Sequence, residues 1–187
     1  MEYKIKVGVS NRHVHLTKED YDFLFDEELT LKYKLNQIGE FASNQTVLIK
    51  GPKGEIDNVR ILGPFRLYNQ VEISRHDARI LGVNPPVRKS GDLNGAENIT
   101  ITGPKGSVEL KESCIIANRH LHMPSKEALK YNLKDNQKVK VVISGDRSGI
   151  IDAYAKITDN SATELHLDTD DANAFGLKGN EELDIII

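Results

Sequence analysis

The stretch Asn11-Arg12-His13-Val14-His15-Leu16 returns 107 positions later as Asn118-Arg119-His120-Leu121-His122-Met123. Each copy follows a strand-like segment and precedes a segment with a helix-start signal. A second pair of segments keeps the same register, because residues 72–82 and 166–176 share the frame Asp-Ala-x-x-x-Gly and align Glu72 with His166. The chain therefore contains an internal pseudo-repeat, and each half offers His-x-His plus one further polar residue.

The first half is longer than the second between these segments. His15 and Glu72 are 57 positions apart, whereas His122 and His166 are 44 apart, so the first half carries 13 additional residues. We place these residues around positions 29–44 and 63–70, where the two halves are least alike.

Most of the chain follows the period of two that is typical of β-strands. Runs rich in β-branched residues occupy residues 5–9, 47–50, 56–62, 99–102, 139–143 and 183–187. Glycine-rich turn signals at 51–54, 103–106 and 145–149 predict hairpin loops. Short helices are expected after Thr17, Ser74, Ser125 and Asp168, with Thr17 and Ser125 suited to cap their helices. This pattern predicts a mostly β protein of small barrels or sandwiches, and it does not fit a TIM barrel.

The composition is that of an ordinary globular domain. The 187 residues carry 25 basic and 28 acidic side chains, so the net charge of −3 argues against a nucleic-acid partner. No apolar run approaches the roughly 20 residues that span a bilayer, and residues 1–4 lead into a strand without a signal peptide. The single cysteine excludes an intrachain disulfide and fits a reducing compartment. We therefore expect a cytoplasmic protein with no membrane association.

Two groups of three residues are candidate metal ligands. Alternate residues of a strand point to one face, so each His-x-His directs two imidazoles to the same point. Neutral imidazole and carboxylate suit Zn²⁺, and three protein ligands leave a fourth position for substrate. Solvated histidines on a strand are the alternative, but duplication of the whole Asn-Arg-His-x-His frame favours metal binding. The groups are His13, His15 and Glu72 in the first half, and His120, His122 and His166 in the second.

Other candidates are single residues. Arg66 lies six positions before Glu72 and is either a solvated surface group or a bidentate clamp for phosphate. Cys114 is expected to be a small buried hydrophobe rather than a nucleophile or ligand. His76 aligns with Asp170 rather than with a histidine, so we expect it to cap a helix or to lie behind the ligands.

The motifs together resemble those of the PduL-type phosphate acyltransferases, or phosphotransacylases. The resemblance covers nearly the whole chain and rests on the paired Asn-Arg-His-x-His motifs, on Gly63-Pro64-Phe65-Arg66 before residues 71–79, and on residues 164–173. It implies two small β-barrels capped by short α-helices, with a dinuclear zinc site between them. It also implies that residues 1–11 and 118–187 form the first barrel and residues 12–117 the second.

The resemblance implies the reaction acyl-CoA + phosphate ⇌ acyl phosphate + CoA, with coenzyme A as a substrate. Two Zn²⁺ ions, or Co²⁺, Mn²⁺ or Fe²⁺ in their place, would bind the two groups of ligands. Arg66 takes the position of the phosphate-binding arginine. The coenzyme A contacts fall on Val9, Ser10, Asn11, Lys53, Arg60 and Asn173.

The expected mechanism is direct transfer of a short acyl group, acetyl or propanoyl, within a ternary complex. Phosphate is already a nucleophile at neutral pH, so positioning and charge stabilisation suffice without a protein nucleophile. Family members packaged in bacterial microcompartments carry an amphipathic N-terminal extension, and here only four residues precede the first expected strand. The resemblance therefore implies an unpackaged cytosolic form that acts on small molecules, and we expect it to be a homo-oligomer.

Two other classes of protein share parts of this ligand pattern. A dinuclear zinc hydrolase, such as a thioesterase or phosphoesterase, would use the same histidines. A cupin-like double barrel is suggested by His13-Val14-His15 followed by Glu19, which mimics the spacing His-x-His-x₃-Glu. Glu19 falls in an expected helix rather than on the strand, so this second alternative is disfavoured.

Overall fold

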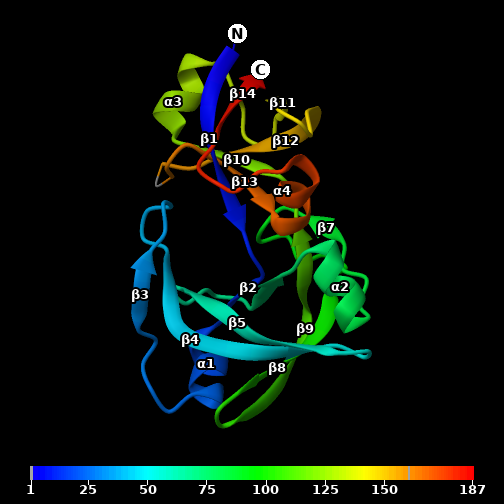
Figure 1. The fold of residues 1–187 in the computed structure, drawn as a ribbon. Helices are drawn as coiled ribbons and strands as arrows, with labels where there is room; N and C mark the ends of the chain where they lie inside the picture. Colours follow the sequence, from blue (N-terminus) through cyan, green and yellow to red (C-terminus); the bar gives the residue numbers. More distant parts are fainter. Residues whose placement is uncertain (1, 160) are drawn as a thin grey trace. The chain divides into compact units, whose positions relative to one another are not determined.

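The computed structural model describes residues 2–159 and 161–187, and the chain divides into two compact units (Figure 1). Unit 1 contains the residues up to Asn11 and those from Asn118 onward, whereas unit 2 contains Arg12–Ala117. The chain therefore passes between the units at the two copies of the Asn-Arg-His-x-His motif. Both units are built mainly from β-strands, which confirms the predicted mostly β class.

Unit 2 is a closed β-barrel with short helices. Its elements are β2 (His13–His15), α1 (Lys18–Leu24), β3 (Leu31–Lys34), β4 (Phe41–Lys50), β5 (Glu55–Gly63), β6 (Gln70–Glu72), α2 (Arg75–Leu81), β7 (Val87–Arg88), β8 (Glu97–Gly103) and β9 (Gly106–Ala117). The strands close a ring in the order β4-β5-β2-β6-β9-β8, because β8 pairs with both β9 and β4. β3 and β7 extend the sheet beyond the ring by pairing with β4 and β9. β3 lies in one of the two stretches where additional residues were expected.

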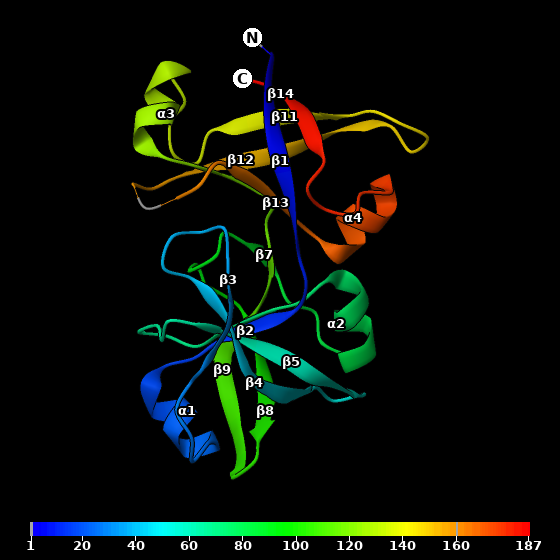
Figure 2. The same ribbon diagram turned by 60° about the vertical axis from the view of Figure 1, so that its left-hand side comes forward.

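Unit 1 is also a closed β-barrel. Its elements are β1 (Glu2–Ser10), β10 (His120–Met123), α3 (Ser125–Lys130), β11 (Lys138–Ile143), β12 (Gly149–Ile157), β13 (Glu164–Asp168), α4 (Thr169–Phe175) and β14 (Glu182–Ile186). The ring runs β1-β13-β10-β12-β11-β14 and closes where β14 pairs with β1. The predicted glycine-rich turns join β4 to β5, β8 to β9, and β11 to β12, each an antiparallel pair. The short helices α1 and α2 lie beside the strands of unit 2 (Figure 2).

The two barrels share one strand topology. β2 is parallel to β5 and antiparallel to β6, and β10 is likewise parallel to β12 and antiparallel to β13. Each repeat, however, gives its first strand to the other barrel. β1 directly precedes β2 in the sequence but pairs with β13 and β14, whereas β9 precedes β10 but pairs with β6 and β8. The repeats have therefore exchanged their first strands.

The shared frame Asp-Ala-x-x-x-Gly forms most of a short helix in each repeat, together with the glycine that ends it. In α2 the Ser74 side chain accepts from the backbone N–H of Asp77, whose carboxylate accepts in return from the backbone of Ser74. In α4 Asp168 is the cap. Both helices end at a glycine in the left-handed conformation, Gly82 with φ 74° and Gly176 with φ 68°. Each repeat therefore has a helix with a side-chain cap three residues before the frame and a left-handed glycine at the end of the frame.

The caps of the other two helices differ from each other. The Thr17 hydroxyl accepts from the backbone N–H of Asp20 at 3.2 Å, which confirms Thr17 as the cap of α1. The prediction that Ser125 caps α3 is wrong, because Ser125 is the first helical residue and Pro124 precedes it without a side-chain hydrogen bond. The fixed φ of Pro124, −62°, leads directly into the helix, so the helix begins one residue earlier than expected.

Each barrel encloses its own hydrophobic core. Val14 and Leu121, the middle residues of the two His-x-His sequences, are completely buried in these cores. Because side chains alternate along a strand, the flanking histidines project from the opposite face. Core packing therefore determines which way the candidate ligands point.

Within residues 2–159 and 161–187, no helix combines the length and the hydropathy that crossing a lipid bilayer requires.

The buried middle residue of β10 gives a test of this arrangement. We expect Leu121→Ala to lower the free energy of unfolding by about 2–5 kcal/mol, because it leaves a cavity in the core of unit 1. The matched control is Leu129→Ala on α3, where the side chain is 80% exposed, and its effect should stay within about 0.5 kcal/mol. Denaturant unfolding of both variants measures the difference. Equal unfolding midpoints for the two variants would contradict the packing described for β10.

Candidate metal centres

The first group of candidate ligands is held by two antiparallel strands of unit 2. β2 and β6 pair so that His13 lies opposite Glu72. The donor atoms of His13, His15 and Glu72 lie within 4.8 Å of one another, and His13 Nε2 is 3.4 Å from Glu72 Oε2. All three residues are buried, so their polar atoms meet away from bulk water.

Gln70 fixes the orientation of the Glu72 carboxylate. The backbone N–H of Gly91 donates to Gln70 Oε1 at 2.7 Å, so the other end of the amide carries the two hydrogens. Gln70 Nε2 donates to Glu72 Oε1 at 2.5 Å. The second carboxylate oxygen of Glu72 then faces His13. Gln70 is fully buried, and no motif of the sequence points to it.

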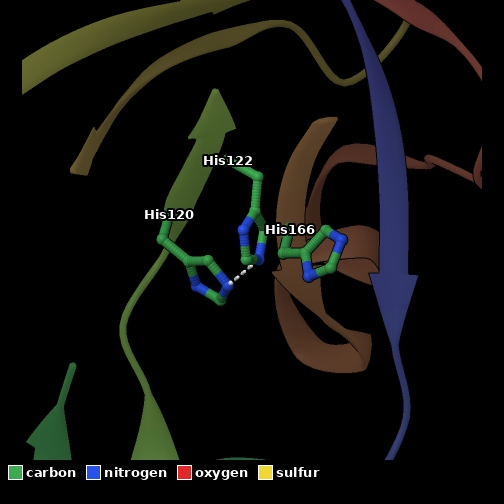
Figure 3. Close-up of side chains that lie close together, drawn as sticks. All are labelled: His120, His122 and His166. Atoms are coloured by element: carbon green, nitrogen blue, oxygen red, sulfur yellow. Dashed lines mark hydrogen bonds between the residues drawn. The ribbon is translucent and has the colours of Figure 1, made fainter. Parts of the chain in front are cut away.

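The second group lies in unit 1 and consists of three histidines, whose rings face a common point (Figure 3). β10 and β13 pair antiparallel with His120 opposite His166, which is the register that the repeat predicts. His120 Nε2 and His122 Nε2 are 3.1 Å apart. His120 Nδ1 lies 2.8 Å from the carbonyl oxygen of Asn118, which can only accept, so Nδ1 donates and the lone pair is on Nε2.

Both groups fit a divalent cation such as zinc. Two donors bound to a tetrahedral zinc at about 2.0–2.1 Å stand about 3.3 Å apart. The donor separations of 3.4 Å in unit 2 and 3.1 Å in unit 1 agree with this geometry. The donor sets differ in charge, because unit 2 offers two imidazoles and a carboxylate whereas unit 1 offers three imidazoles.

An ion pair connects each motif copy to the following helix frame of its repeat. Arg12 Nη2 lies 2.8 Å from Oδ1 of Asp77, whose side chain is fully buried. Arg119 binds both oxygens of Asp171, with Nε and Nη2 each at 2.7 Å, and this hydrogen bonding raises the pKa of Arg119. These pairs anchor β2 to α2 and β10 to α4. The recurrence of Arg and Asp in register in the two repeats is the sequence signal for this contact.

Arg66 lies near the end of β2, and its side chain is 20% exposed. Its backbone N–H donates to the carbonyl of Leu16, the residue after His15. Its Nη2 lies 3.2 Å from Glu40 Oε1, and its guanidinium is 5.9 Å from the centre of the Tyr68 ring. Arg66 is therefore held by a carboxylate from the 29–44 stretch, a partner that no sequence pattern predicts.

The six residues predicted to contact coenzyme A are distributed over both units. Val9, Ser10 and Asn11 lie at the end of β1 and just after it, and Ser10 is the strand partner of Asp168, the cap of α4. Asn173 is exposed on α4 and its carbonyl accepts from Arg147.

In unit 2, Lys53 is exposed and its side chain lies against Gly82. Arg60 Nη1 donates to the carbonyls of Ser43 and Asn44 at 3.1 and 2.9 Å. The predicted coenzyme A contact at Arg60 thus involves a side chain that already binds the backbone of β4.

Three remaining candidates are also placed by the structure. Cys114 is completely buried, and desolvation raises its pKa to about 12, which confirms it as a small core residue. His76 is exposed on α2, and the cap of that helix is Ser74, so the prediction of His76 as a cap is wrong. Glu19 lies on α1, and the donor group of unit 2 contains Glu72 rather than Glu19. The cupin spacing His-x-His-x₃-Glu therefore does not describe this group.

Comparison with known proteins identifies the family. A family model described as phosphate propanoyltransferase matches residues 6–178. The phosphate propanoyltransferase of Thermotoga maritima is 51% identical over 186 residues, which cover 97% of this chain and 89% of the relative. Those of Rhodobacter capsulatus and Salmonella typhimurium are 45% and 44% identical, cover 94% and 92% of this chain, and match over 83% of their own lengths. Matches of this extent confirm the predicted resemblance: the chain belongs to the phosphate propanoyltransferase family and is an acyltransferase.

Proposed function

We propose that this protein transfers a short acyl group, propanoyl or acetyl, between coenzyme A and inorganic phosphate. The observation that carries the proposal is the duplicated donor group, His13, His15 and Glu72 in one unit and three histidines in the other. The names of the relatives support propanoyl as the acyl group and phosphate as the acceptor. The donor geometry supports a metal-assisted reaction.

The six donors would hold two divalent cations, one in each group. Bound there, the cations would supply positive charge to the phosphate, to the developing oxyanion and to the departing thiolate. The chain's own residues fix the donors before any substrate arrives. Gln70 orients the Glu72 carboxylate, the carbonyl of Asn118 fixes the tautomer of His120, and the Arg–Asp pairs hold the strands.

In this proposal Arg66 binds the phosphate. Its planar guanidinium can hold two phosphate oxygens while a third attacks the thioester carbon. A C–O bond then forms, the C–S bond breaks, and the thiolate of coenzyme A leaves and takes up the proton that the phosphate gives up. Phosphate entry competes with Glu40, whose carboxylate is 3.2 Å from Arg66 Nη2.

Both substrates would be bound at the same time, with no acyl-enzyme. Phosphate is a competent nucleophile at neutral pH, so the protein needs to contribute only orientation and charge. Burial of Cys114, whose pKa is raised to about 12, supports this view, because the thiolate is the nucleophilic form of cysteine. We therefore expect sequential kinetics.

A coupled assay of coenzyme A release tests the proposed reaction. Release from propanoyl-CoA or acetyl-CoA should require phosphate and should yield acyl phosphate, which hydroxylamine traps. Release without phosphate would indicate a hydrolase and contradict the proposal. Ping-pong kinetics would contradict direct transfer.

Removal of one histidine should abolish metal binding in one donor group and leave the other group unaffected. We expect His120→Ala to lose one of two bound metal equivalents and to lose turnover, because only two of three donors remain in unit 1. The matched control is His76→Ala, which removes an exposed histidine outside both groups. Metal analysis and the coupled assay measure both effects. Full metal content together with full activity in His120→Ala would refute the ligand assignment.

Replacement of Arg66 should affect phosphate rather than metal. We expect Arg66→Ala to lower kcat/KM for phosphate about 10- to 100-fold, because this is the effect of losing one hydrogen bond to a charged group. The metal content should stay unchanged. Arg79→Ala, at an exposed arginine on α2, is the matched control. A phosphate titration at saturating acyl-CoA distinguishes the variants. Identical titrations of Arg66→Ala and the unaltered protein would exclude the clamp.

The buried thiol gives a prediction with a defined pH dependence. Because the pKa of Cys114 is raised to about 12, the thiolate should stay unpopulated in the folded protein from pH 7 to 9. An exposed cysteine, with a pKa of about 8.5, would ionise within that range. A disulfide reagent should therefore label Cys114 only after denaturation, and Cys114→Ala should keep its turnover. Rapid labelling of the folded protein at pH 8 would contradict this.

A further inference from the structure

A buried carboxylate lies behind the three histidines of unit 1. Glu164 occupies β13 two residues before His166, and its strand partner on β10 is His122. Glu164 is 7% exposed, and its Oε2 lies 2.7 Å from Nε2 of His166. Carboxylates are rarely buried to this extent unless they are paired, so this contact accounts for its position.

The contact determines which nitrogen of His166 faces the other histidines. Figure 3 shows one ring nitrogen of His166 turned toward His120 and His122 and the other turned toward β1. Because Glu164 accepts at Nε2, that nitrogen carries the hydrogen and the lone pair lies on Nδ1. The tautomer that Glu164 selects is thus the one that aims a lone pair at His120 and His122.

Gly8 makes room for this pair of side chains. On β1, Gly8 is the strand partner of His166. A Cβ at position 8 would lie 2.9 Å from Cδ of Glu164 and 3.2 Å from Cδ2 of His166, closer than carbon atoms normally approach. The neighbouring strand therefore has a glycine where any side chain would push the Glu164–His166 pair out of place.

Unit 2 contains the equivalent position with a different residue. Gln70 lies two residues before Glu72 and is the strand partner of His15, as Glu164 is of His122. In both units the residue at this position binds the third donor through a hydrogen bond. A carboxylate donor is oriented by an amide N–H, and an imidazole donor is oriented by a carboxylate, so each orienting group matches the chemistry of its partner.

We infer that Glu164 is a positioning residue that directs Nδ1 of His166 into a metal site with His120 and His122. This inference rests on the proposed metal binding and adds a residue and a donor atom to it. Histidine ligands commonly donate their other N–H to a carboxylate, which fixes the ring and raises its basicity. Loss of such a partner lowers metal affinity about 10- to 100-fold.

The test is metal binding by the whole purified protein, stripped of metal and titrated with Co²⁺ or Zn²⁺ against a chromophoric chelator. Unaltered protein should bind two equivalents. In Glu164→Gln one equivalent should weaken about 10-fold or more and the other should keep its affinity, and Glu164→Ala should weaken the same equivalent further, because Gln still offers an accepting oxygen. The visible absorption of Co²⁺ in the weakened site should change as well.

Two further variants separate positioning from general damage. Glu182→Gln removes an exposed carboxylate from β14 in the same unit and should leave both affinities unchanged. Gly8→Ala alters no polar group but should weaken the same equivalent as Glu164→Gln. If Gly8→Ala does not fold, Glu164→Gln decides alone.

Unchanged affinities in Glu164→Gln, or an equal fall at both sites with a lower unfolding midpoint, would overturn the inference. Unaltered protein that binds no metal would overturn the proposed function itself, so the two failures are distinguishable.

Discussion

The antiparallel pairing of two short strands is the constraint on which both donor groups depend. His13 lies opposite Glu72 and His120 opposite His166, so each third donor comes from the strand beside the His-x-His strand. A slip of one residue would turn every donor into the hydrophobic core, because side chains alternate along a strand. The fully buried residues Val14 and Leu121 oppose such a slip, since they would lose their own burial. The strand register that buries the core residues is thus the same register that brings the donors together.

The same alternation explains how much of the site could be predicted from the sequence. The six donors follow from a period of two and a repeat in register, both of which are local patterns. Gln70 and Glu164 lie two residues before the third donors and so share their face, but one repeat has an amide where the other has a carboxylate. Comparison of the repeats therefore gave no signal for them. The contact between Arg66 and Glu40 could not be predicted either, because Glu40 belongs to a stretch without a counterpart in the second repeat.

The strand exchange could not be predicted from local patterns either. β1 and β2 are separated by two residues, and nothing in that spacing indicates that they belong to different barrels. The pairing partner of a strand depends on long-range packing, so the boundaries at residues 11 and 118 came only from the family resemblance. The start of α3 is a smaller example: Ser125 has the chemistry of a cap, yet Pro124 already sets the backbone.

The exchange of first strands has a consequence for how the polypeptide can be divided. The turn at Gly103–Gly106 is the boundary between the repeats, and β8 and β9 on its two sides are hydrogen-bonded neighbours. A chain cleaved there would yield two fragments of similar topology. Each fragment would lack one strand of its own barrel and would carry one strand that belongs to the other barrel. Identical subunits exchange an equivalent strand in the same way in a domain-swapped dimer. The molecule thus has the connectivity of such a dimer whose two protomers have been fused into one polypeptide.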